Sequence, residues 1–313
     1  MTTDTPPRRK WHFTRWLIVL IIAVFGWSGW RAYAFRSALA EAKALGWTVN
    51  YTDPVEEIRK NWKTAFKKGT WLDGVTRLMI PSTESFEPHA SVAHRLNPKM
   101  LIIEDAATMH DLSALAPLTR LENIWLTNAT ALTNVDALQN HTALEVVRLR
   151  DCAALTHVDV LRKLPALDAV DLTDCTGLTN VNDVKDVSVL RVLKLNGCAA
   201  VTNFDGLKNL PALQILVLDG CTGLPDLDVL RNLAALRHLG LNGCPKLTNV
   251  DALKNLTALE TLELAGCKGL TSLEGLKNLP ALQHVTLTGC RGLTKESVKA
   301  LKAAHPTAKV WEP

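Results

Sequence analysis

The chain has 313 residues and a formal net charge of +4, from 35 basic and 31 acidic side chains. So small a charge, without a basic block or a recognisable nucleic-acid motif, excludes nucleic acid as the expected partner. Leu and Ala dominate the composition, whereas Phe, Trp and Tyr together make up only 5%.

The N-terminus carries a membrane signal. Residues 1–15 are basic, and an uncharged run, WLIVLIIAVFGWSGW, occupies residues 16–30. Extending this run to residue 35 adds one charge, Arg31, and gives roughly the length that spans a bilayer. Trp residues lie near both ends of the segment, as they do at membrane interfaces. The sequence therefore predicts a cytoplasmic tail at 1–15 and a transmembrane signal-anchor helix at 16–35.

The positive flank predicts that the remainder of the chain is exported. We therefore expect a single-pass protein of the cell (inner) membrane, with its repeats on the periplasmic or extracellular side. A cleaved signal peptide is the alternative, because Ala32-Tyr33-Ala34 forms an A-x-A site and cleavage near Ala34 would release the protein. A buried soluble helix is a third interpretation. Helix-forming sequence directly after the site favours retention.

Residues 36–97 are predicted to be a linker and an N-terminal cap. The pattern indicates a helix over 36–45, a short strand over 47–51 and an amphipathic helix over 53–66 that starts with Asp-Pro. This last helix either covers the open end of a repeat stack or lies on anionic lipid. Residues 81–97 fit no repeat and are expected to form a loop or an irregular cap.

A 23-residue period governs the rest of the chain. Metal sites and disulfide frameworks use short, uneven cysteine spacings, whereas a constant period indicates tandem repeats. The aligned units read L-x-x-L-x-L-x-G-C-x-x-L-T-x-V-D-x-L-x-x-L-P-A, and about nine of them fill residues 98–293. The cysteines occupy one slot of this unit: Cys152, Cys175, Cys198, Cys221, Cys244, Cys267 and Cys290.

The L-x-x-L-x-L-x-x-(N/C)-x-L core resembles the leucine-rich repeat family, in particular the short bacterial, internalin-like repeats. The resemblance implies an α/β solenoid with parallel strands on a concave face and short helical turns on a convex face. The residues agree, because the L-x-L step alternates as a strand and leucines at i and i+3 suit a helical turn. Residues 294–313 are predicted to be a C-terminal cap.

The same period extends beyond the regular repeats. Leu78 and Ile80 lie 23 residues before Leu101 and Ile103, which predicts a further strand at the start of the stack. Val310 follows Leu287 by 23 residues and predicts a last strand.

Two positions of the repeat unit carry cysteine or aspartate, and for both we predict a structural role. The first repeats have Ala106 and Ala129 at the cysteine slot, so this slot selects a small buried group, and the cysteines are predicted to be a structural ladder of free thiols. An aspartate begins the second half of many units, where we expect it to cap the helical turn. The aspartates at this slot are Asp136, Asp159, Asp205, Asp228 and Asp251.

The outward positions of the strands vary between repeats and mix aromatic, arginine and aliphatic side chains, as protein-binding hot spots do. We predict that this face binds a protein partner of unknown identity; neutral drift on a structural, envelope-organising spacer is the alternative. The predicted contact residues are Trp125, Val146, Arg148, Arg150, Asp171, Lys194, Ile215 and Val217.

No catalytic, cofactor or metal site is predicted. The sequence contains no Ser-His-Asp order, Gly-rich phosphate loop or H-E-x-x-H motif. His238 and His284 share an outward column, but two repeats separate them by roughly 10 Å, too far to ligate one ion. We therefore expect a protein that is not an enzyme.

Overall fold

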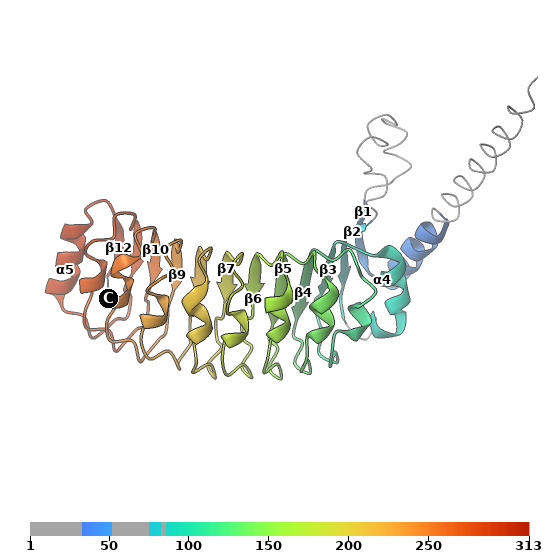
Figure 1. Cartoon of the computed structure of the whole chain (residues 1–313), viewed down its shortest axis with the longest axis horizontal. Helices are drawn as coiled ribbons and strands as arrows, with labels where there is room; N and C mark the ends of the chain where they lie inside the picture. The colour runs from blue at the N-terminus through green and yellow to red at the C-terminus, as the bar shows by residue number, and fades with distance from the viewer. Residues whose placement is uncertain (1–32, 52–74, 83–85, 313) are drawn as a thin grey trace, which may run out of the picture.

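The computed structural model (Figure 1) describes residues 33–51, 75–82 and 86–312, which include all of the repeats. The predicted tail, all but the last three residues of the predicted anchor, and the predicted amphipathic helix over 53–66 lie outside these ranges. No helix among the described residues is both long enough and apolar enough to cross a bilayer.

A single sheet runs the length of the molecule, and its twelve strands follow one another in chain order. The first pair, β1 and β2, is antiparallel, and every later pair is parallel. The strands are β1 (Thr48–Tyr51), β2 (Val75–Ile80), β3 (Met100–Ile103), β4 (Asn123–Thr127), β5 (Val146–Arg150), β6 (Ala169–Asp171), β7 (Val192–Lys194), β8 (Ile215–Val217), β9 (His238–Gly240), β10 (Thr261–Glu263), β11 (His284–Thr286) and β12 (Lys309–Trp311).

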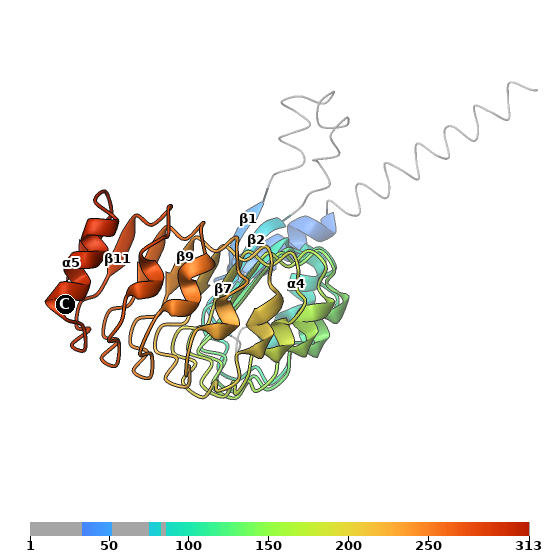
Figure 2. The same ribbon diagram turned by 60° about the vertical axis from the view of Figure 1, so that its left-hand side comes forward.

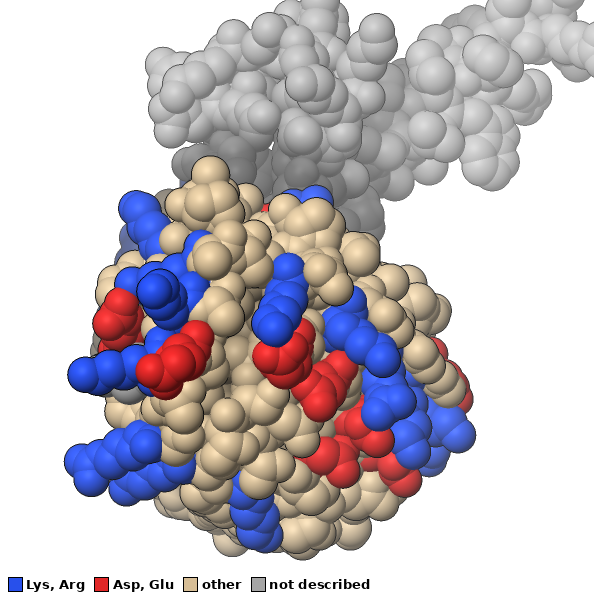
Figure 3. All heavy atoms as spheres, turned by 90° about the vertical axis from the view of Figure 1, so that its left-hand side faces the viewer, with Lys and Arg blue, Asp and Glu red and all other residues tan. Residues whose placement is uncertain are grey.

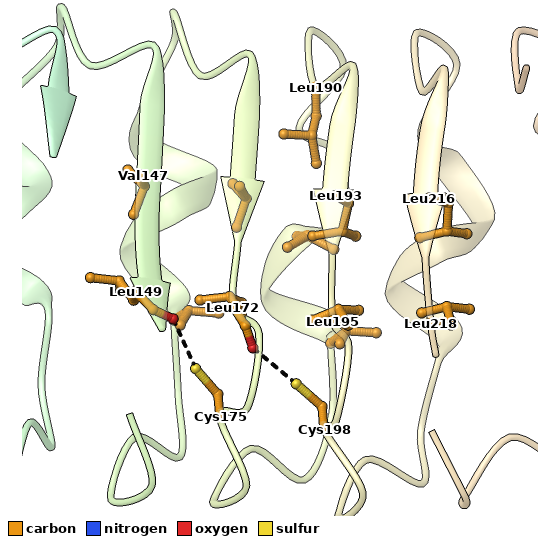
Figure 4. Close-up of a cluster of buried hydrophobic side chains, with 14 of the residues drawn as sticks. Val147, Leu149, Leu172, Cys175, Leu190, Leu193, Leu195, Cys198, Leu216 and Leu218 are labelled. Atoms are coloured by element: carbon orange, nitrogen blue, oxygen red, sulfur yellow. Dashed lines mark hydrogen bonds between the residues drawn. The ribbon is translucent and has the colours of Figure 1, made fainter. Parts of the chain in front are cut away.

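The strand register repeats the sequence period. Leu193, Leu216 and Leu239 are paired neighbours on successive strands, and each is fully buried. Side chains alternate across a strand, so the leucines point inward as a ladder while the residues on either side of them point outward (Figure 4). The strands at β2 and β12, predicted from the period alone, are both present and paired in parallel.

Short 3₁₀ helices follow the strands and form a row along the opposite side of the stack (Figure 2). This arrangement confirms the predicted parallel sheet with short helical turns. The turns are η3 (Ser113–Leu115), η4 (Asp136–Asn140), η5 (Asp159–Lys163), η6 (Asn182–Val184), η7 (Asp205–Asn209), η8 (Asp228–Leu230), η9 (Asp251–Asn255) and η10 (Glu274–Leu276).

The predicted capping role of the aspartates is wrong. Asp136 is the first residue of η4, and no side-chain cap bond forms there. Instead, its backbone N–H donates to Oδ1 of Asn134, two residues earlier, at 2.7 Å. Asp205 and Asn203 repeat this contact at 2.9 Å. The turn begins one residue earlier than the pattern indicated, with Val135 or Phe204 at the N-cap position. The preceding amide therefore closes the turn, and the aspartate is free for an i,i+3 ion pair, as between Asp205 and Lys208 at 2.6 Å.

The cysteine slot lies just after a turn with positive φ. Gly197, Gly220, Gly243, Gly266 and Gly289 adopt φ of 68–79° immediately before a cysteine, which explains the Gly-Cys dipeptide. In earlier repeats Asn128, Asp151 and Asp174 occupy the same slot, also at positive φ, since Asn and Asp tolerate this conformation best after Gly.

All seven cysteine side chains are buried and free. Six of them donate to the backbone carbonyl 26 residues earlier, as Cys175 does to Leu149 at 3.2 Å and Cys198 to Leu172 at 3.1 Å (Figure 4). The other donor–acceptor distances fall between 2.9 and 3.4 Å. Burial raises the pKa of both Cys198 and Cys244 to about 12, so these thiols stay protonated.

The N-terminal end of the stack is closed by helical residues 33–44, with Ala38 and Ala42 fully buried against the core. Residues 86–97 also contribute: a 3₁₀ turn, η2 (Glu87–His89), leads into α4 (Ala90–Leu96), which buries Val92, Ala93 and Leu96. The expectation of a loop here was therefore wrong for 86–96. A cap needs one apolar stripe, and this segment supplies it at helical spacing outside the repeat period.

The C-terminal end is closed by α5 (Lys295–Ala304). The Oγ1 of Thr294 accepts from the backbone N–H of Ser297 at 3.1 Å and so caps the helix. Val298 and Leu301 are buried against the last repeat. Strand β12 follows and completes the sheet. Seen from this end, basic and acidic side chains are interspersed around uncharged surface (Figure 3).

Candidate binding face

The outward side chains of the strands form three columns, which we call the strand face. It corresponds to the predicted concave face. The first column runs from Met100 to His284, and the central column from Ile102 through Trp125 to Thr286, each step joining paired residues of adjacent strands. The third column lies two residues after the central one and includes Arg150 and Asp219.

Trp125 and Arg148 are neighbours in the central column and stack on each other. The guanidinium carbon of Arg148 lies 4.0 Å from the centroid of the Trp125 ring. This cation–π contact holds the guanidinium over the indole ring. Arg148 makes no hydrogen bond or ion pair with any other described residue, so its donors remain available to a ligand. The Nε1 of Trp125 is buried and has no partner among the described residues.

Arg150 and Asp171, both predicted contact residues, bind each other instead. The Nε and Nη2 of Arg150 donate to Oδ2 of Asp171 at 2.9 and 2.6 Å. The other oxygen of Asp171 accepts from Thr173, from the hydroxyl at 2.6 Å and from the backbone N–H at 3.2 Å. Burial tends to raise the pKa of Asp171, but the hydrogen bonds from Thr173 and Arg150 lower it overall. At 4% exposure, Asp171 is a support for Arg150 and offers little surface of its own.

Lys194 lies one strand beyond Asp171 in the central column. It is partly exposed and forms no ion pair with any described residue. Ile215 and Val217 follow on β8, the first partly exposed and the second 8% exposed. Together with Val146 on β5, they supply the apolar part of the predicted set. The structure thus places all eight predicted residues on β4–β8 of one face.

A carboxylate network on β8–β10 was missing from the predicted contact set. The Nδ2 of Asn242 donates to Oδ2 of Asp219 at 3.1 Å and to Oε2 of Glu263 at 2.8 Å. The backbone N–H of Asn242 donates to the second oxygen of Asp219 at 2.8 Å. His238 lies 3.6 Å from Glu263. Burial, with a further contribution from the nearby Glu263 charge, raises the pKa of Asp219 despite the bonds from Asn242.

Gly240 lies in the central column between Val217 of β8 and Glu263 of β10. A Cβ at this position would lie 2.7 Å from Cγ1 of Val217 and 2.9 Å from Oδ1 of Asp219. Only glycine therefore lets these two side chains lean across β9. At the far end of the face, His284 stacks on Trp311 with ring centroids 5.9 Å apart, and Trp311 remains 49% exposed.

No group of three or more His, Cys, Asp or Glu side chains in the described ranges is arranged to hold a metal ion. His238 and His284 have different partners, Glu263 and Trp311. The polar chemistry of the strand face therefore consists of paired and unpaired charges rather than a ligand set.

Comparison with known proteins agrees with this architecture. Residues 234–278 match the family model described as Leucine Rich repeats (2 copies). These residues contain leucine-rich repeats, and the chain has the leucine-rich repeat fold. No curated protein sequence matches it. The leucine-rich repeat domain of the type III effector XopL superposes with a TM-score of 0.52 at 16% identity, covering 100% of this chain and 97% of that one. An internalin of Listeria monocytogenes gives a TM-score of 0.41 at 18% identity, covering 84% and 90%.

At 16% identity, the similarity to the XopL domain shows a shared fold and nothing further. This fold is a repeat scaffold whose extended face generally binds protein partners. The nature of a partner and its position on the present chain depend on the side chains of the strand face.

Proposed function

We propose that this leucine-rich repeat protein is anchored in the membrane, has no catalytic activity and binds a protein partner through the strand face. One observation carries the proposal: on the same strands, inward residues are nearly invariant while outward residues differ at almost every step. Leu193, Leu216 and Leu239 face inward, whereas their outward successors are Lys194, Val217 and Gly240. Packing restricts the first set in every unit, whereas no packing requirement repeats from unit to unit in the second.

The composition of the face supports binding over neutral drift. An exposed sheet of a pure spacer would need only soluble side chains, yet this face stacks Trp125 under Arg148 and holds Arg150 on a buried carboxylate. Trp and Arg are the residues that dominate the energetics of protein interfaces. Pre-positioned side chains also lose less conformational entropy when a partner binds.

Site-specific photo-crosslinking in the native host tests this function. A photoreactive residue replaces Lys194 on the strand face and, as the matched control, Lys254 on η9 on the opposite side. We expect a discrete protein adduct from position 194 and none from 254. If a folded, membrane-associated protein gives no adduct from 194, the spacer function replaces the binding function.

The anchor forms part of the same proposal and rests on the uncharged run at 16–30 and its basic flank. The structure adds that Ala34, at the predicted cleavage site, lies within helical residues 33–44, whose Ala38 and Ala42 pack on the core. This continuity favours retention over cleavage. The intact mass of the membrane-fraction protein tests it: retention preserves residues 1–32, whereas cleavage near Ala34 yields a shorter, released chain.

The side of the membrane needs its own measurement. A reporter enzyme that is active only outside the cytoplasm, fused after Pro313, should be active if the repeats are exported. An inactive reporter on a stable fusion would place the repeats in the cytoplasm and overturn the predicted orientation.

A further inference from the structure

Charges on the strand face are arranged differently from those in the row beside it. In the row just before the strands, opposite charges on adjacent repeats pair with one another: Lys99 with Glu122 at 2.9 Å, Arg237 with Glu260 at 3.0 Å, and Arg191 with Asp168. Adjacent repeats thus readily neutralise each other on this scaffold.

On the strand face between β5 and β10 the unpaired charges are segregated instead. The unpaired cations, Arg148 and Lys194, belong to β5 and β7, and the carboxylates without a Lys or Arg partner, Asp219 and Glu263, belong to the units of β8 and β10. Asp171 lies between the two cations, but its charge is compensated by Arg150. Between β5 and β10 the face is therefore positive at its N-terminal end and negative at its C-terminal end. The exposed carboxylate of Glu104 follows β3, two strands before Arg148, and lies outside this stretch.

Arg148 is suited to bind a carboxylate. The contact with Trp125 holds the guanidinium in place, and its N–H groups have no partner among the described residues, so they can form two parallel hydrogen bonds to a planar acid. At the other end, Asn242 holds Asp219 and Glu263 near each other, and the 3.6 Å approach of His238 is the one His, Lys or Arg contact that the described residues make with this pair. A partner ammonium or guanidinium would compensate the two carboxylates.

The region between the two charged ends is apolar. Ile215 and Val217 lie there, and the side chain of Val217 leans over Gly240 of β9. Adjacent strands are about 4.8 Å apart, so the five steps from Arg148 to Glu263 span roughly 24 Å, or about seven extended residues.

We propose that the strand face binds an extended, charge-polarised protein segment, with acidic side chains on Arg148 and Lys194, apolar ones over Ile215 and Val217, and a basic one at Asp219 and Glu263. This inference rests on the proposed function and specifies the partner's chemistry. The fit of opposite charges at both ends sets the direction in which the segment lies.

Two synthetic 12-residue peptides of one composition test the polarity. The first has three Glu at one end, an apolar centre and three Lys at the other; the second alternates the same charges. Binding of each labelled peptide to the full chain in detergent micelles is measured by fluorescence anisotropy. We expect the polarised peptide to bind at least ~10-fold more tightly than the alternating one, with affinity falling as salt rises. Equal binding, or no binding of either, would overturn the inference.

Charge substitutions locate the two ends. R148E with K194E should weaken the polarised peptide at least ~10-fold, and D219N with E263Q should weaken it by a smaller factor, because the amides keep the hydrogen-bonding shape. K254E, the same charge change on the opposite side, is the matched control and should have no effect. An R148E/K194E variant that retains its circular dichroism spectrum and behaves like K254E would contradict the assignment.

The native partner separates this inference from the proposed function. An adduct from position 194 that disappears in the R148E and E263K backgrounds supports both. An adduct that persists in both backgrounds leaves the binding function intact and refutes the charge polarity. The absence of any adduct refutes both.

Discussion

The two sides of each strand differ in what they tolerate. On the inward side, Leu216 contacts its equivalents in both neighbouring repeats and is fully buried. On the outward side, the residues that directly follow Leu216 and its two equivalents are Val217, Lys194 and Gly240. An inward change disturbs three units at once because interiors are close-packed, whereas an outward change meets solvent. The difference indicates that the scaffold is specified by one half of each strand and leaves the other half to function.

The largest effect should follow from breaking the inward ladder. Leu216→Ala removes a fully buried side chain and leaves a cavity, so the free energy of unfolding should fall by about 2–5 kcal/mol. Ile215→Ala, one residue away on the outward side, should cost less than about 1 kcal/mol. Urea denaturation followed by circular dichroism measures both. Similar losses at the two positions would show that the outward side is also part of the core.

A smaller loss should follow from breaking the Arg150–Asp171 ion pair on the outward side. Arg150→Ala leaves the buried Asp171 carboxylate without its main charged partner, at an expected cost of roughly 1–3 kcal/mol at neutral pH. The matched control is Arg231→Ala, whose exposed pair with Asp228 at 2.7 Å should contribute less than about 1 kcal/mol.

The Asp171 contribution has a predictable pH dependence. Its folded pKa is lowered, so the ionised carboxylate stabilises the fold above the unfolded pKa of about 3.9, and this stability is lost as pH falls through the folded value. The stability difference between wild type and Arg150→Ala should therefore shrink as the pH falls below about 4. A difference that stays constant down to acid unfolding would mean that Arg150 acts through packing alone.

The cysteines also point inward, but alanine is almost the same size. Replacing one cysteine by alanine should therefore lower the free energy of unfolding by less than the changes above. Cys221→Ala removes one sulfur and its 3.2 Å bond to the Leu195 carbonyl, at an expected cost of about 1 kcal/mol. Ala106 and Ala129, both fully buried, fill the same slot naturally. Thermal unfolding of the single variant measures the cost, and a loss as large as that of Leu216→Ala would give the thiols a larger structural role.

The raised pKa values of the buried thiols give a second prediction for the cysteine ladder. With their pKa values raised to about 12 in the fold, Cys198 and Cys244 contribute stability that is complete below the unfolded pKa near 9 and is lost as pH rises toward 12. A thiol reagent should therefore react slowly with the native protein at pH 8 and rapidly after denaturation. Fast labelling of native protein would show that the ladder opens locally.

The period predicted the sheet because inward packing repeats unit by unit, including the degenerate strands at Leu78 and Val310. It did not predict α4, which lies outside the period. It also did not predict that the side chain of Asn134, and not that of Asp136, accepts the hydrogen bond at the start of η4. All eight predicted contact residues lie on the strand face, but the side-chain pairs on this face were not predicted. Arg150 with Asp171, and Asn242 with Glu263, are diagonal partners 21 residues apart, and such pairs depend on side-chain conformations that a column of letters does not contain.

The smallest effect on stability, and the sharpest test of the two-sided strand, concerns Arg148. Its contacts are the stack on Trp125 and solvent, so Arg148→Ala should lower the free energy of unfolding by only about 0.5–1 kcal/mol. Crosslinking of the partner from position 194 should nevertheless fall sharply, because Arg148 belongs to the proposed binding surface. Lys254→Ala on the opposite side should change neither quantity. If Arg148→Ala left crosslinking intact, the stacked pair would be a feature of the surface alone, and the function of the face would have to lie with the residues around Val217 and Gly240.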